Sequence, residues 1–199
     1  MKKFIVLFAS VFGAILYGNA QTVIWSDDFE GDKGWQTFEY KKMYSAEYSK
    51  DGTLLLKSED DEYRALTTCR TNLTPTKNFT ISVEATPKSG LKDDAYFGVA
   101  FNCLDRDNYY YFCIEKGFAY FYEIKNGEIV RHDYDLIKNT KSKSFNLEIR
   151  KSGMSAIFIV NDEETMFVEN IDVRSSKVGL YVSGKTQVAF DNMKITQQL

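Results

Sequence analysis

Three glutamates in predicted strands are the side chains of this sequence best suited to acid–base chemistry. Hydrolysis of a glycosidic bond needs only two carboxyl groups, about 5 to 10 Å apart across that bond. Glu115, Glu123 and Glu148 each fall in a run of alternating apolar and polar residues, so they could converge on one sheet face. Acids that alternate with core residues are commonly solvated. The trio therefore supports only an alternative hypothesis, a glycoside hydrolase whose first pair would be Glu115 with Glu148.

Other catalytic and metal-binding patterns do not occur in the sequence. His132 is the only histidine, which excludes a metal site built from several histidines, and it stands in a polar run that reads as a surface strand end. Neither Gly-x-Ser-x-Gly nor His-Glu-x-x-His is found. The cysteines include no Cys-x-x-Cys pair, so a zinc site is not expected.

Tyrosines are the residue type that could bind a sugar without any chemistry. Aromatic rings stack on the apolar faces of pyranose rings, while planar polar groups bind the hydroxyls. If Tyr110 and Phe112 point to a core, their neighbours Tyr109 and Tyr111 point away from it. We therefore expect an exposed aromatic binding patch with polar partners, formed by Tyr96, Asn102, Tyr109, Tyr111, Glu148, Arg150 and Tyr181. Tyrosines favour strands whatever their function, so an ordinary sheet surface is the alternative.

Short alternating segments separated by turn residues predict the elements that must hold these side chains. Residues 145–150 alternate strictly, which turns Phe145, Leu147 and Ile149 towards a core. Asn126-Gly127 between residues 118–124 and 128–134 is a strong hairpin signal. Roughly a dozen such segments suit two packed sheets better than one open sheet. We predict an all-β, two-sheet antiparallel β-sandwich.

The first twenty residues read as an export signal. Lys2 and Lys3 precede a short apolar stretch, and Gly18-Asn19-Ala20 supplies small residues before a cleavage point. The apolar stretch is shorter than the roughly 20 residues of a membrane span. We expect a secreted, periplasmic or extracellular, bacterial protein without a membrane insertion after cleavage. Residues 21–199 would then form a single domain.

Composition limits the partners of this mature chain. Removing the two lysines of the signal takes the formal net charge from −3 to −5. A mildly acidic chain without a basic cluster argues against nucleic acid as a partner. Three cysteines, Cys69, Cys103 and Cys113, leave at least one thiol outside any internal disulfide. We expect them to be buried as small apolar residues.

Several segments in order resemble the concanavalin A-like lectin and glucanase superfamily, which includes laminin G-like domains. They are Trp25-Ser-Asp-Asp-Phe-Glu-Gly31, Phe97-Gly-Val-Ala-Phe-Asn102, Tyr109-Tyr-Tyr-Phe112, Val178-Gly-Leu-Tyr-Val182 and Ala189-Phe-Asp-Asn-Met193. The resemblance implies a jelly roll whose concave face often binds carbohydrate. It also implies a structural calcium where the first and last strands meet, with Asp28, Glu30 and Asp191 as ligands. The glucanase motif Glu-x-Asp-x-x-Glu is not present in this sequence.

Together these observations favour a secreted, non-catalytic carbohydrate-binding β-sandwich that holds a glycan on an aromatic concave face. A glycoside hydrolase of the same fold is the first alternative. A protein–protein adhesion or assembly module is the second, since the laminin G-like resemblance implies protein partners as well.

Overall fold

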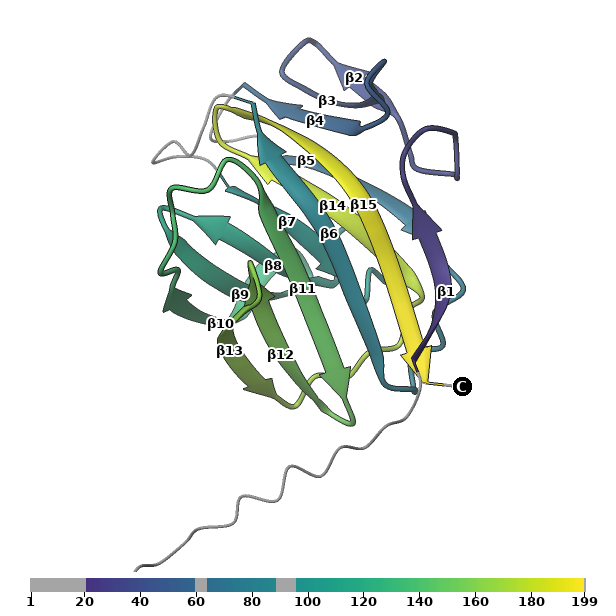
Figure 1. Ribbon diagram of the computed structural model, residues 1–199, viewed down its shortest axis with the longest axis vertical. Coiled ribbons are helices and arrows are strands. Elements are labelled where there is room, and N and C mark those ends of the chain that lie inside the picture. Colours follow the sequence, from purple (N-terminus) through teal and green to yellow (C-terminus); the bar gives the residue numbers. More distant parts are fainter. Residues whose placement is uncertain (1–20, 60–63, 89–95, 199) are drawn as a thin grey trace, which may run out of the picture.

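The structure is a computed structural model that describes residues 21–59, 64–88 and 96–198. These residues form fifteen β-strands and no helix, arranged as two antiparallel sheets packed face to face (Figure 1). The predicted β-sandwich is confirmed. The predicted signal, residues 1–20, lies outside the described residues. Over the described ranges we find no helix with the length and apolar character needed to cross a bilayer.

The larger sheet has nine strands. They are β1 (Gln21–Asp27), β2 (Phe38–Tyr40), β3 (Tyr44–Tyr48), β4 (Leu54–Ser58), β6 (Phe79–Pro87), β11 (Phe145–Ser152), β12 (Ser155–Val160), β13 (Glu163–Glu169) and β15 (Thr186–Gln198). Their order is β13-β12-β11-β6-β15-β4-β3-β2, and β1 also pairs with β15. The length of β15 explains this arrangement, because its first half pairs with β4 and its second half with β1. The two ends of the domain meet there, as expected.

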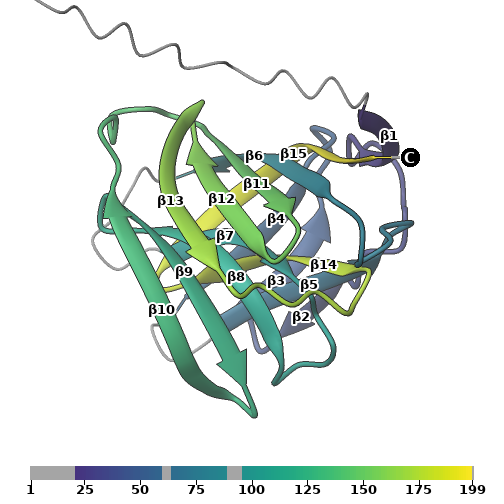
Figure 2. The ribbon, with the colours of Figure 1, turned by 90° about the horizontal axis from the view of Figure 1, so that it is seen from below.

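The smaller sheet has six strands and carries the candidate site. They are β5 (Arg64–Arg70), β7 (Tyr96–Phe101), β8 (Tyr109–Glu115), β9 (Phe118–Lys125), β10 (Glu128–Leu136) and β14 (Lys177–Ser183). Their order is β10-β9-β8-β7-β14-β5. Figure 2 shows the two sheets as layers, with β10 at the outer end of its sheet.

The core between the sheets is built from alternate residues of both. Phe97, Phe112 and Phe121 from the small sheet meet Phe145 and Phe158 from the large one, and none of the five is exposed to solvent. Ring centroids lie 5.0 Å apart for Phe112 and Phe158 and 5.7 Å apart for Phe97 and Phe145. Burial of such large apolar surfaces is the main force that holds the two sheets together.

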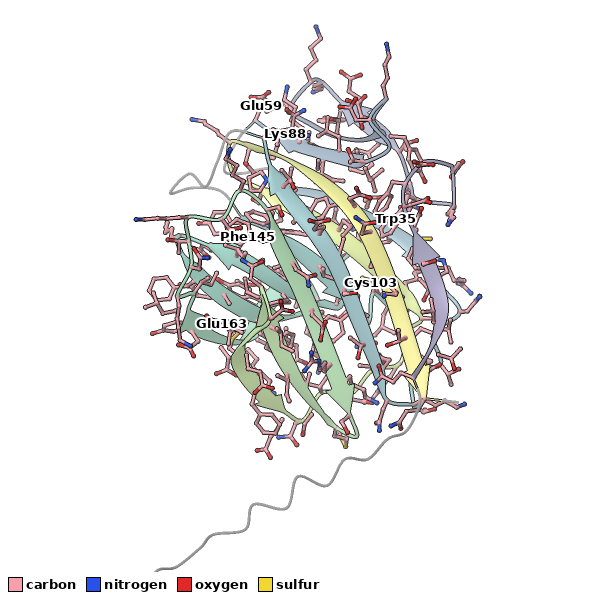
Figure 3. All side chains as sticks on the ribbon, in the orientation of Figure 1. Trp35, Glu59, Lys88, Cys103, Phe145 and Glu163 are labelled. Carbon is pink, nitrogen blue, oxygen red and sulfur yellow. The ribbon has the colours of Figure 1, made fainter. Side chains whose placement is uncertain are left out.

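The connection after β1 folds back on that strand and closes one end of the core. Asp27 is buried, and its two carboxylate oxygens accept hydrogen bonds from the backbone N–H of Phe29 at 2.8 Å and from Trp35 Nε1 at 2.9 Å. Figure 3 shows Trp35 beside β1. A buried carboxylate is tolerated here because both of its oxygens are hydrogen-bonded.

The three cysteines are buried free thiols, as expected. Cys69 belongs to the core between the sheets, whereas Cys103 and Cys113 belong to a second buried cluster on the other side of the small sheet. That second cluster is where the tyrosines gather.

Candidate functional site

Seven tyrosines lie on the outer face of the six-stranded sheet, which we call the tyrosine face. They are Tyr96, Tyr109, Tyr111, Tyr120, Tyr122, Tyr134 and Tyr181. Alternation places them there: Tyr110 and Phe112 belong to the core between the sheets, whereas Tyr109 and Tyr111 belong to the separate cluster. The prediction that Tyr109 and Tyr111 point away from the core is therefore confirmed.

The rings of the tyrosine face form a continuous stack across the sheet. Tyr111 lies between Tyr122, with ring centroids 4.7 Å apart, and Tyr181, 4.9 Å away. The row continues from Tyr122 to Tyr120 at 5.5 Å and to His132 on β10 at 6.1 Å. These spacings suit offset-stacked aromatic pairs.

The stack crosses β7 because that strand carries small residues at this point. β7 lies between β14, which bears Tyr181, and β8, which bears Tyr111. The backbones that carry the two rings are therefore about 9.6 Å apart, two strand spacings. Gly98 faces Tyr181 and Ala100 faces Tyr111. The rings lean over these two residues and meet, which a bulkier residue on β7 would prevent.

The expected exposure of the central tyrosines was wrong. Tyr109, Tyr111 and Tyr181 retain only 5%, 6% and 3% of their accessible surface. Their rings cover one another, so these faces are not free to stack on a sugar. At the β10 end of the same face Tyr134 keeps 59% of its surface. Alternation determines which side of a sheet a residue faces, and neighbouring side chains determine whether it is exposed.

Burial also sets the protonation of this face. Desolvation raises the pKa of the Tyr111, Tyr122 and Tyr181 hydroxyls, so each stays neutral at physiological pH. The pKa of Arg64 is raised chiefly by Tyr181, with further contributions from Tyr109 and Tyr111 and a hydrogen bond to Tyr109. The tyrosine face therefore offers neutral hydroxyls beside a permanent cation.

A pocket of about 440 Å³ opens on the tyrosine face. Aromatic rings, an aliphatic side chain and polar groups contribute to its lining, which consists of Arg64, Tyr96, Tyr111, Glu115, Lys116, Tyr122, Ile129, Tyr181 and Ser183. A concave surface that combines aromatic rings with placed polar groups is typical of small-ligand sites.

Glu115 supplies the only carboxylate among the described residues that line this pocket. It accepts a hydrogen bond from the Tyr122 hydroxyl at 3.2 Å and lies 3.7 Å from Lys116 Nζ. A carboxylate that is held in place in this way can accept two hydrogen bonds from neighbouring sugar hydroxyls.

The three glutamates of the hydrolase hypothesis do not come together. Glu115 lies on the tyrosine face, and Glu148 lies on the large sheet between the core residues Leu147 and Ile149, so its side chain points outward from that sheet. Glu123 pairs across strands with Tyr110 and lines a different pocket at the end of the sandwich. The expected convergence was wrong because Glu115 and Glu148 belong to different sheets.

The remaining predicted polar partners are also elsewhere. Arg150 forms an ion pair with Glu148 on the large sheet, away from the tyrosines. Asn102 is buried, and its Oδ1 accepts hydrogen bonds from the backbone N–H of Arg174 at 2.7 Å and of Ser175 at 3.0 Å. Asn102 therefore holds a connection in place and has no free amide oxygen for a ligand.

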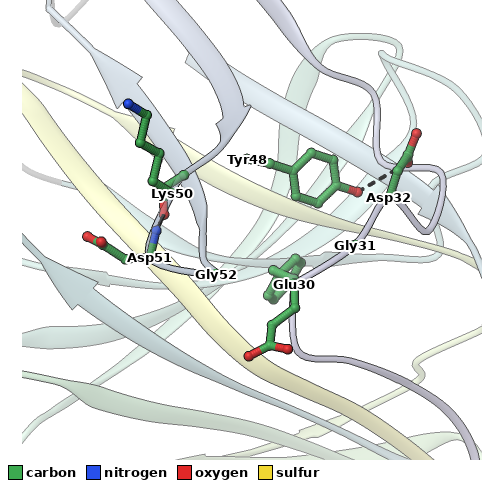
Figure 4. Close-up of a pocket in the computed structure, with 9 residues that line it drawn as sticks. Glu30, Gly31, Asp32, Tyr48, Lys50, Asp51 and Gly52 are labelled. Atoms are coloured by element: carbon green, nitrogen blue, oxygen red, sulfur yellow. Dashed lines mark hydrogen bonds between the residues drawn. The ribbon is translucent and has the colours of Figure 1, made fainter.

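Of the residues predicted to bind calcium, Glu30 lines a second pocket, of about 630 Å³, between the β1–β2 and β3–β4 connections (Figure 4), whereas Asp28 and Asp191 do not line it. Their carboxylates do not converge: Asp28 accepts from the Glu30 backbone N–H at 3.4 Å, and Asp191 from the Asn192 N–H at 2.7 Å. In Figure 4, Glu30 and Asp51 point in different directions. Among the described residues no three His, Cys, Asp or Glu side chains are placed to hold a metal ion. Calcium binding stays a prediction, and the proposed function does not depend on it.

Sequence reasoning missed several residues of the pocket. Tyr122 alternates with the core residue Phe121 in the same way as Tyr111 alternates with Phe112, so the same rule applied to β9 would have found it. Arg64 and Ser183 face each other across β5 and β14, which are far apart in the sequence. No local pattern indicates that pairing.

No family model matches the sequence, and no curated protein matches it either. Solved structures do match. The carbohydrate binding module CBM66 from Bacillus subtilis aligns with a TM-score of 0.60 at 16% identity, covering 81% of this chain and 94% of that one. A β-glucanase from Bacillus licheniformis aligns with a TM-score of 0.62 at 10% identity, and the alignment covers 88% of this chain and 97% of the β-glucanase. A laminarinase from Rhodothermus marinus aligns with a TM-score of 0.63 at 8% identity, and the alignment covers 90% of this chain and 98% of the laminarinase.

This chain has a concanavalin A-like jelly-roll fold. The predicted jelly-roll fold is thereby confirmed. Neighbours with this concanavalin A-like architecture include a carbohydrate-binding module and glucan-degrading enzymes. At these identities the likeness concerns the fold alone, so the function must be argued from the pocket.

Proposed function

We propose that this chain is an exported, non-catalytic carbohydrate-binding module that holds a glycan in the pocket of the tyrosine face. The observation that carries this proposal is the composition of that pocket. Tyr96 and Tyr122, which are only partly buried, line it with aromatic rings, and Glu115 and Arg64 add charged groups. Rings with a few hydrogen-bonding groups are what a sugar, with apolar ring faces and hydroxyl edges, requires.

The geometry also supports binding without hydrolysis. Both mechanisms of glycoside hydrolysis use two carboxyl groups that flank the bond. Glu115 has no second carboxylate beside it among the described residues lining the pocket, and its nearest charged neighbour is Lys116. The relatives that supply the comparison bind or degrade polysaccharides by their names, which makes β-glucans and xyloglucan suitable first probes.

Isothermal titration of the purified protein with laminarin, mixed-linkage β-glucan and xyloglucan, alongside a polysaccharide array, tests the proposal. Glu115→Ala and Arg64→Ala should each weaken binding about tenfold or more, because a hydrogen bond to a charged group contributes about 1.5 to 3 kcal/mol. Glu148→Ala and Arg150→Ala remove the same residue types from the large sheet and should leave binding unchanged.

Two outcomes would overturn the proposal. One is that no polysaccharide binds. The other is that the four variants bind equally well, which would place the site elsewhere. Release of new reducing ends from a bound polysaccharide, abolished by Glu115→Ala, would instead identify a hydrolase.

A further inference from the structure

β10 is the free edge of the six-stranded sheet. It is nine residues long, and β9 is its only sheet partner among the described residues (Figure 2). Its other side therefore presents backbone N–H and C=O groups that no strand of the described chain pairs. Such an edge is a template for another strand.

β10 carries several exposed apolar side chains. Ile129, Val130, Tyr134 and Leu136 each expose half or more of their surface. They are four of the nine large apolar side chains exposed in the described residues, and all four stand on one strand. Clustering of this kind marks an interaction site, whereas single exposed apolar residues do not.

Charges on β10 restrict what can pair with this edge. Arg131 lies 3.6 Å from Asp133 of the same strand and donates a hydrogen bond to the backbone carbonyl of Glu169 at 2.7 Å. A bulge between Ile129 and Arg131 further bends the strand. Charges and bulges generally discourage pairing with an arbitrary strand. A partner must therefore match this charge pattern.

We propose that a second copy of this chain pairs antiparallel along β10, with Arg131 opposite Asp133 of the second copy and a twofold axis at His132. Facing residues of an antiparallel pair point to the same side, so under twofold symmetry one residue must face its own copy. An axis at Arg131 or at Asp133 places two like charges face to face. An axis at Tyr134 places Asp133 opposite Asp135. An axis at Asp133 also brings Arg131 opposite Asp135, but only the axis at His132 joins opposite charges without placing like charges face to face, and it joins Arg131 to Asp133 twice.

The pairing has a consequence for the tyrosine face. A twofold axis perpendicular to the sheet keeps both tyrosine faces on the same side, so six strands from each copy would form one continuous sheet. Tyr134 of each copy would then stand near the junction. If the proposed glycan binding also holds, two pockets on one surface would bind a polysaccharide with avidity. The pairing itself does not depend on glycan binding.

Sedimentation velocity of the purified protein over a concentration series, to about 100 µM, tests the pairing, because interfaces of ordinary size associate at micromolar or lower concentration. The native chain should sediment as a dimer. Arg131→Asp and Asp133→Arg each create two like-charge contacts and should weaken dimerisation about tenfold or more. Mixing the two variants restores opposite charges at both contacts, so the mixture should dimerise like the native chain. Arg150→Asp, with the same charge change on the large sheet, should have no effect.

The mixing experiment decides the register as well as the surface. A native chain that stays monomeric throughout the series overturns the proposal, and so does a dimer that neither variant weakens. Variants that are monomeric both alone and mixed overturn the His132-centred register. Asp133→Arg leaves the contact between Arg131 and Glu169 in place, and circular dichroism of each variant verifies that it is folded.

Discussion

Gly98 shows how one residue permits the central stack of the tyrosine face. A Cβ atom at this position would lie 1.9 Å from the Phe112 carbonyl oxygen and 2.6 Å from Cys113 Cα. Both are backbone atoms of the neighbouring strand β8, so β7 and β8 would have to separate. Because Gly98 has no side chain, the Tyr181 ring can extend across β7 and stack on Tyr111.

Gly98→Ala should therefore lower the free energy of unfolding by about 3 kcal/mol, the upper part of the range for overpacking. Urea unfolding followed by circular dichroism measures this. Gly31→Ala is the matched control, because nothing lies within 4 Å of its added Cβ. Equal stability of the two variants would show that the strands yield easily at Gly98.

At the scale of elements, the hairpin of β9 and β10 supports the open end of the tyrosine face. Its turn residues Asn126 and Gly127 have φ angles of 53° and 81°, both in the left-handed region. The Gly127 N–H also donates to the Asp107 carbonyl oxygen at 2.9 Å, which joins this turn to the connection before β8. The Asn-Gly pair fits two left-handed residues with little strain.

Gly127→Val should destabilise the hairpin by about 1 to 2 kcal/mol, the cost of left-handed backbone for an ordinary L-residue. Because β10 is an edge strand, we expect faster amide hydrogen exchange in β9 and β10 than in β11 or β15 of the same variant. Asn126→Gly, which tolerates the same φ, should leave both exchange and stability nearly unchanged. Uniform acceleration across all strands would contradict a local effect.

At the scale of the whole molecule, cysteines are buried in clusters on both sides of the small sheet. Their burial makes the stability of the fold decrease at alkaline pH. Burial raises the pKa of Cys69 to about 11 and of Cys103 to about 12, and it raises the pKa of Cys113 as well. In the unfolded chain these thiols ionise near pH 8.5. Between these values the unfolded state binds fewer protons than the folded state, so stability must fall as pH rises.

The free energy of unfolding in urea, measured with a reductant from pH 7 to pH 11, should be level up to about pH 8 and then decline. The decline should become shallower in Cys69→Ala, because one contributing thiol is removed. Native thiols should also resist alkylation at pH 8 and react after unfolding. A stability that stays constant to pH 11 would contradict thiols with raised pKa values.

Local pattern was enough to predict much of this molecule. Strict alternation of apolar and polar residues in β11 predicted the side of the sheet that Phe145 faces, and once Tyr110 and Phe112 are assigned to the core the same geometry predicts the side of Tyr111. The Asn126-Gly127 turn follows equally from backbone sterics. The all-β sandwich and the jelly-roll resemblance were predicted from many such local patterns taken together.

Only the tertiary structure decided what the tyrosine face can do. The pairing of β14 with β5 brings Arg64 beside Ser183, and the two-sheet arrangement separates Glu148 from Glu115. Ring stacking then buries Tyr111 and leaves Tyr134 open. The physical reason is that periodicity along a strand specifies direction only, whereas exposure and proximity depend on which distant strands become neighbours.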